Sequence, residues 1–217
     1  MYRIFYAERD TTIYEKDPEQ NTGIDEILEL RKIASGSRLN GVIQADTYNS
    51  RFLIDFGTEI TTLSSSIVDG NIPEISTHPD SASVYLNLRA SDATDLLTSY
   101  DIKVYPISES WDNGNGQFSD IPKNRAGASW YNRSGDAKAL SGVAWDTGSA
   151  HSQGTSAGTT NVKGGGTWIT GSGYEASQSF ENESPDIRVD VTDIVSKWID
   201  STISNNGFIV KRPYSDE

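Results

Sequence analysis

Apolar and polar residues alternate in short runs along most of the chain, with the two-residue period of β-strands that bury one face. The runs lie at 2–6, 11–14, 51–56, 83–89, 102–107, 186–191 and 207–211. Run 51–56 is almost continuously apolar, which favours a central strand of a sheet. Pro106 has no N–H to donate, so it is expected at a sheet edge or a strand end. Residues 27–33 fit either a strand or a short helix.

One segment has helical spacing instead. Its apolar residues recur at i, i+3, i+4, i+7 and i+8: Val191, Ile194, Val195, Trp198 and Ile199. This stripe predicts an amphipathic helix that buries Trp198. Thr192 is expected to cap the N-terminus of the helix, where the helix dipole also favours Asp193. A shorter turn of helix is expected within 91–100.

Segment 139–173 differs in composition from the rest of the chain. Apart from His151, its only acidic or basic residues are Asp146 and Lys163, and it is rich in Gly, Ser and Thr, including the triple glycine 164–166. Such a composition buries little apolar area for its length, so we expect a long loop that becomes ordered on contact. Trp145 and Trp168 lie within it and need a docking surface, either on their own domain or on a partner.

Length, charge and cysteine content narrow the class of protein. The chain has 217 residues, which fits one domain spanning 1–217. About eight strands and one late helix favour an all-β fold, a jelly-roll-like antiparallel β-sandwich with one short C-terminal amphipathic helix. The net charge of −13 repels phosphate, so binding to nucleic acid or to an anionic membrane is not expected. No apolar run is long enough to span a membrane, and the first residues lack the apolar core of a secretory signal. The absence of cysteine excludes disulfides and thiolate metal sites.

Several segments, taken in order, carry a resemblance to a known family. They are the opening 10–14, 21–23 and 28–30, the Arg-plus-apolar run 51–56, the Leu-alternating run 85–88, the run 102–107 with the tryptophan turn 109–112, the Val-Thr helix with Trp at 191–198, and the Asn-Gly with the last run at 206–210. Together they span nearly all of the chain and resemble DNRLRE-type domains, which are β-sandwich modules related to carbohydrate-binding module family 96.

The details of the long inserts resemble one version of that domain. Segments 112–116, 127–130 and 165–170 are similar to the form found in virion structural proteins of tailed phages. The resemblance implies a β-sandwich scaffold without catalysis. The chain departs from the secreted members of the family, where the module usually sits behind a signal or a catalytic domain, and we expect a single leaderless module here.

Residues able to carry catalysis are few. The two histidines, His78 and His151, lie in polar, turn-like sequence, and no G-x-S-x-G elbow is present. Acidic residues are plentiful, so a carboxylate pair for glycoside hydrolysis stays open as a minor alternative. Asp55 is the most interesting acid because it lies in an apolar run, and we expect it to pair with a basic group or to cap a turn. We therefore predict a protein that is not an enzyme.

Metal and phosphate sites have weak sequence support. The oxygen-rich segment 112–120 superficially resembles a calcium loop, but it lacks the D-x-[DN]-x-[DN]-G spacing, and turn chemistry explains its Asn-Gly pairs better. The triple glycine 164–166 is followed by a strand-like run rather than by the helix that a phosphate site needs. We predict no metal and no cofactor.

Aromatic residues crowd the middle of the chain, and they are the candidate contact residues: Trp111, Trp130, Tyr131, Trp145, Trp168 and Tyr174. Exposed aromatic faces stack on sugars, which would suit a stand-alone carbohydrate-binding module. Aromatic residues are also enriched in cores and subunit interfaces, and we favour packing over glycan binding.

These observations lead to one expectation with one alternative. We expect a structural component of a bacteriophage particle, in the tail, neck, baseplate or outer shell, that is assembled in the host cytoplasm. Its partners would be other virion proteins and copies of itself as a homo-oligomer. The alternative is a carbohydrate-binding module with a glycan as its ligand.

Overall fold

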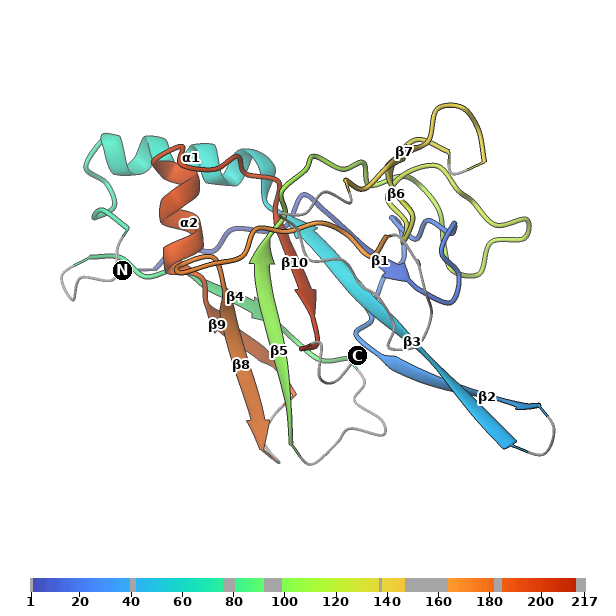
Figure 1. Ribbon diagram of the computed structural model, residues 1–217. Coiled ribbons are helices and arrows are strands. Elements are labelled where there is room, and N and C mark those ends of the chain that lie inside the picture. Colours follow the sequence, from blue (N-terminus) through green and yellow to red (C-terminus); the bar gives the residue numbers. More distant parts are fainter. Residues whose placement is uncertain are drawn as a thin grey trace.

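The computed structural model describes residues 2–39, 42–75, 81–91, 99–136, 138–146, 164–181 and 185–213, with the backbone alone for 33–39 and 42–47. Its strands are β1 (Arg9–Tyr14), β2 (Lys32–Leu39), β3 (Val42–Asp55), β4 (Tyr85–Leu88), β5 (Ser99–Pro106), β6 (Asn132–Ser134), β7 (Val143–Ala144), β8 (Ala176–Glu181), β9 (Ile187–Asp190) and β10 (Phe208–Lys211), and its helices are α1 (Gly57–Val68) and α2 (Thr192–Ile199) (Figure 1). His78, His151 and most of 91–100 lie outside the described residues, so the expectations for them are not addressed.

An antiparallel six-stranded sheet organises the fold. Its order is β1-β3-β10-β5-β8, and β2 also pairs with β3. The last strand in sequence, β10, inserts between β3 and β5, with Ile209 opposite Leu53 on one side and Tyr105 on the other. Two smaller antiparallel pairs, β4-β9 and β6-β7, complete the strands. The class is therefore all-β, as the alternating runs predicted.

The two faces of the main sheet carry two separate hydrophobic cores, because successive side chains of a strand point to opposite faces. On β3, Phe52 and Ile54 belong to the first core, whereas Leu53 between them belongs to the second. The first core lies between the sheet, the β4-β9 pair and both helices. The second core is covered by the loops that carry the tryptophans.

Most of the predicted strands are confirmed. Strands β1, β4, β5, β9 and β10 fall within or next to the predicted runs. Run 51–56 ends β3, which lies between β1 and β10 and is therefore central, and Pro106 is the last residue of β5. The predicted strand at 2–6 is wrong, because these residues form no strand. Segment 27–33 was expected to be a strand or a short helix, and only Lys32 and Ile33 are in a strand, at the start of β2.

The long strand β3 pairs with two different strands along its length. Its residues 50–55 pair with β1, and its residues 42–49 pair with β2. The β2-β3 hairpin therefore extends beyond the main sheet as a two-stranded ribbon, which projects away from the helices in Figure 1. Only its base was expected from sequence, because the serine- and glycine-rich β2 has a weak strand pattern.

Helix α1 was not predicted. Its sequence is rich in Ser and Thr, which are poor helix formers in isolation. Leu63 packs into the first core, with Ile60 and Ile67 partly buried beside it. Two carboxylates accept hydrogen bonds from its first amides, Asp55 from the Gly57 N–H at 3.0 Å and Glu8 from the Thr58 N–H at 2.7 Å. Tertiary packing and the caps supplied by these two carboxylates thus outweigh the weak helix propensity of the sequence.

Helix α2 lies where the apolar stripe placed it, and Trp198 is buried as predicted. The predicted cap is wrong. Thr192 is the first helical residue, and its hydroxyl accepts the Val84 N–H at 2.9 Å, which ties the helix to the residue before β4. The free Thr192 N–H is satisfied by the Asp190 carboxylate at 3.0 Å instead.

Candidate functional site

Four of the six candidate aromatic residues gather in the second core. They are Trp111, Trp130, Trp145 and Trp168, each at most 3% exposed. The indole N–H of Trp111 donates to the Asn206 carbonyl and that of Trp145 to the Ser129 carbonyl, both at 2.9 Å. Their ring faces are covered by protein, so a sugar cannot stack on them in this arrangement.

Arg51 lies between two of these rings and explains much of how they are arranged. Its guanidinium is 4.8 Å from the centroid of the Trp130 ring and 5.2 Å from that of Trp168, and it donates to the Gly165 carbonyl at 2.7 Å. A charged group this deeply buried needs such cation–π and hydrogen-bond partners. Arg51 therefore holds the loop backbone and the tryptophans on the sheet.

The triple glycine belongs to the same packing. Gly165 has φ +85°, and a Cβ there would lie 2.5 Å from Nη1 of Arg51 and 2.9 Å from the Trp130 ring. The glycines thus allow the backbone to approach the core closely, as only a residue without a side chain can. Both described ends of the predicted loop, 139–146 and 164–173, include residues packed in the single chain, Trp145 and Trp168 among them, so these parts do not need a partner in order to dock.

The two candidate tyrosines lie apart from that core. Tyr131 follows Trp130 directly, yet its side chain is 39% exposed. Tyr174 is half-buried, with Nζ of Lys197 on α2 at 5.0 Å from its ring centroid. The structure therefore brings the four tryptophans together and leaves only these two candidates open to solvent.

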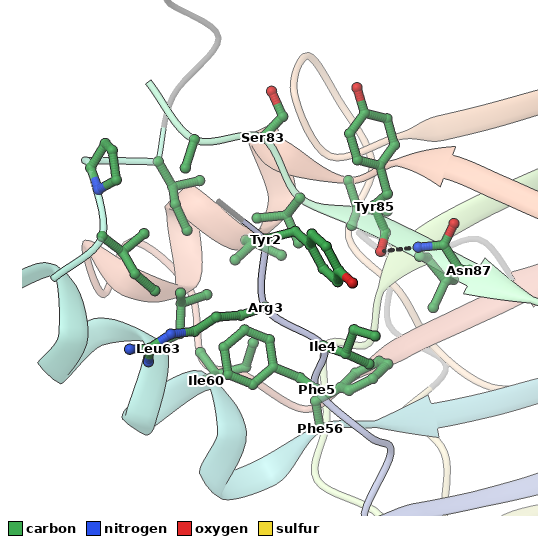
Figure 2. Close-up of a pocket in the computed structure, with 18 of the residues that line it drawn as sticks. Tyr2, Arg3, Ile4, Phe5, Phe56, Ile60, Leu63, Ser83, Tyr85 and Asn87 are labelled. Carbon is green, nitrogen blue, oxygen red and sulfur yellow. Dashed lines mark hydrogen bonds between the residues drawn. The ribbon is translucent and has the colours of Figure 1, made fainter. Parts of the chain in front are cut away.

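A large apolar groove lies on the opposite side of the molecule, and the sequence did not reveal it. Its volume is about 850 Å³, and it opens between the N-terminal segment 2–6, helix α1, strand β4 and the segments 71–75 and 81–84 (Figure 2). Its floor reaches the first core at Leu63, Val195 and Phe208. A cavity of this size, mostly apolar in lining, is typical of a binding surface.

The N-terminal segment presents two different faces at this groove. Phe5 packs against the first core, and Arg3 donates to the Ser66 hydroxyl of α1 at 2.9 Å. The alternate residues Tyr2, Ile4 and Tyr6 are 84%, 65% and 75% exposed. Several large apolar side chains so exposed, beside an open apolar groove, mark an interaction surface. The alternation was predicted as a strand, and it instead signals this two-faced segment.

Charged residues near the groove are held by local partners. The Asp55 carboxylate is buried and pairs with Arg9, with Oδ2 at 2.7 Å from Nη2 and 2.9 Å from Nε. This confirms that Asp55 pairs with a basic group, and its other oxygen caps α1. Glu8 has its pKa lowered by the hydroxyl and the N–H of Thr58. These contacts fix residues 8 and 9 to the body, next to the segment whose outer face is open.

A second ion pair lies at the far edge of the sheet. The Lys103 ammonium donates to the Glu175 carboxylate at 2.5 Å, and the Tyr105 hydroxyl donates to the other oxygen at 2.9 Å. These hydrogen bonds, that from Lys103 first, lower the pKa of Glu175 although its partial burial opposes them. Such an arrangement links β5 to the start of β8 and is structural in character.

The acidic and amide residues of 112–120 take part in turns. Asn21 is fully buried and donates to the carbonyls of Asn113 and Ala128 at 2.7 and 2.8 Å, while its own oxygen accepts the Gly116 N–H at 2.8 Å. This one amide therefore holds three loop segments together. Within the described ranges, no group of three His, Cys, Asp or Glu side chains is placed to hold a metal ion. None of the described helices is long and apolar enough to cross a membrane.

No protein-family model matches the chain, and no curated protein or solved structure matches it either. The resemblance to DNRLRE-type domains therefore stays a prediction, and the site is interpreted from its geometry alone.

Proposed function

We propose that this chain is a non-enzymatic structural component of a bacteriophage particle and that it assembles through protein–protein contacts. The observation that carries the proposal is the apolar contact surface of the N-terminal segment and its groove. Exposed aromatic and aliphatic side chains around an apolar depression are enriched at subunit interfaces.

The assignment to a phage particle rests on the resemblance to the virion form of the DNRLRE-type domain. In this proposal the all-β fold corresponds to the jelly-roll-like sandwich of that family. The partners are other virion proteins and further copies of the chain, and the location is the tail, neck, baseplate or outer shell. Symmetric particles repeat each interface many times, so contacts of modest strength are sufficient.

The alternative, a carbohydrate-binding module, has less support from the arrangement of aromatics. Burial of the four tryptophans leaves Tyr131 and Tyr174 as the candidate stacking residues, and they lie on different segments. A saturable tyrosine-dependent response to an oligosaccharide, lost in Tyr131→Ala, would favour this alternative.

The proposed function is tested by density-gradient centrifugation of particles from cells that carry the sequence, with the chain followed by antibody. We expect it to band with the particles and to stay there after a high-salt wash, which removes adsorbed acidic proteins. A chain that remains at the top of the gradient, or that the wash removes, would refute a role as a structural component.

A further inference from the structure

The backbone of the N-terminal segment makes no hydrogen bond to the backbone of any other described residue. Among the described residues, the first backbone hydrogen bond along the sequence is from the Glu8 N–H to the Asp55 carbonyl, at 2.9 Å. Residues 2–7 make none within the described parts of the chain, and they are held by the side chains of Arg3 and Phe5 instead. An extended segment with open N–H and C=O groups is a template for strand pairing.

The exposed face of this segment is a palindrome. Tyr2, Ile4 and Tyr6 read the same in both directions, with Ile4 at the centre. If two copies pair antiparallel about Ile4, Tyr2 of each faces Tyr6 of the other, and the two Ile4 side chains meet on the axis. Aromatic and aliphatic cross-strand pairs of this kind stabilise a ladder. A two-fold interface requires such self-complementarity.

The charge distribution opposes a second copy less at this place than over the acidic remainder of the surface. The chain has a net charge of −13, so two copies repel each other over most of their surfaces. The residues lining the groove include Arg3 and Arg188 and no acidic residue. Two copies can therefore approach through this surface without bringing acidic side chains of one copy close to acidic side chains of the other.

We propose that two copies of this chain associate through an antiparallel, two-fold pairing of their N-terminal segments 2–6, which closes the apolar groove of each copy. The inference rests on the proposed assembly function and names the surface that performs it. The partner is a second copy, and the contact is formed by the outer face of Tyr2, Ile4 and Tyr6.

The absence of cysteine from the sequence makes a direct test available. Opposed residues of an antiparallel pair have Cα atoms about 4.5–5.5 Å apart, within the range that a disulfide spans. Ile4→Cys, at the centre of symmetry, should form a disulfide-linked dimer under mild oxidation. Leu140→Cys is the matched control because Leu140 is an apolar residue at least as exposed as Ile4, on a different part of the surface. Equal cross-linking of the two variants would overturn the proposal.

A second variant measures the association itself. The wild-type chain should be a dimer by light scattering at concentrations above the micromolar range. Ile4→Lys should weaken its dimerisation at least about a hundredfold, because symmetry brings two unpaired charges together. Leu140→Lys should leave it unchanged, and both variants should keep the wild-type urea midpoint when it is measured at a concentration low enough for all three chains to be monomeric. A monomeric wild type, or an Ile4→Lys variant that still dimerises, would contradict the interface.

The outcomes separate this inference from the proposed function. A chain that bands with particles but is unaffected by Ile4→Lys would leave the function standing and remove the interface. A chain that dimerises through Ile4 but is missing from particles would keep the interface and remove the phage role.

Discussion

Truncation of Trp168 should destabilise the isolated chain strongly. Trp168 is buried in the second core, with its ring centroid 5.2 Å from the Arg51 guanidinium and 5.8 Å from the centroid of the Tyr105 ring. Burial of roughly 200–250 Å² at about 25 cal/mol per Å² gives roughly 5–6 kcal/mol as an upper estimate. Core Trp→Ala changes typically cost about 3–5 kcal/mol, and loss of the cation–π contact acts in the same direction.

We therefore expect Trp168→Ala to lower the free energy of unfolding by about 4 kcal/mol, which corresponds to a fall in Tm of roughly 8–16 °C for a chain of this size. Urea titration followed by far-UV circular dichroism gives this value without relying on tryptophan fluorescence. Tyr131→Ala is the control, since that ring is 39% exposed and its loss should cost less than about 1 kcal/mol. Equal, small losses in the two variants would refute the second core in the isolated chain and would mean that segment 164–173 docks only in an assembly.

Three further changes test other contacts. Asn21→Asp replaces a buried donor of two hydrogen bonds by a carboxylate that faces two carbonyls, so at pH 7 it should lower the free energy of unfolding by about 3–5 kcal/mol. Because burial raises the pKa of that acid, the urea midpoint of the variant should recover toward wild type as the pH falls toward about 4. A loss of stability that does not depend on pH would contradict this. Gly127 has φ +113°, and a Cβ there would lie 2.6 Å from the Gly114 Cα, so Gly127→Ala should lower the free energy of unfolding, followed by a thermal melt, by more than about 2 kcal/mol. Gly70→Ala, at φ +71° in open space, should lower it by about 1 kcal/mol. Equal losses in the two variants would argue against the close approach at Gly127. The pKa of Glu175 is lowered in the folded chain, so its ionised form contributes stability at pH values above the pKa of the unfolded chain. This contribution is lost as the pH falls through the folded pKa, so Glu175→Gln should be less stable than wild type at pH 7 and equal to it at low pH. A stability difference that does not change with pH would exclude the ion pair as the cause.

Sequence patterns predicted those parts of the fold that depend on local periodicity. The strands around Leu86 and Val104 alternate, those around Leu53 and Ile209 are almost continuously apolar, and helix α2 has a complete apolar stripe. Helix α1 was missed because its Ser- and Thr-rich sequence has little intrinsic preference, and it forms where the sheet and two carboxylate caps support it. Local pattern carries no information about such distant partners.

The candidate site was predicted less well, for a related reason. Aromatic content indicated that the tryptophans need partners, but it could not say whether those partners belong to the same chain. Arg51 provides the answer, since it lies far from Trp130 and Trp168 in sequence and directly between them in space. The groove was not predicted, because it is formed by segments from both ends of the chain, as Tyr2 and Phe208 show.

The central claim is that many copies of this chain are built into a particle, and quantitative peptide mass spectrometry of density-banded, salt-washed particles tests it most directly. The account predicts the chain at a fixed ratio to the major capsid protein, with a copy number that matches a ring or shell symmetry and is even if pairs form through Ile4. Its absence from clean particles, or a copy number that varies between preparations, would contradict the account.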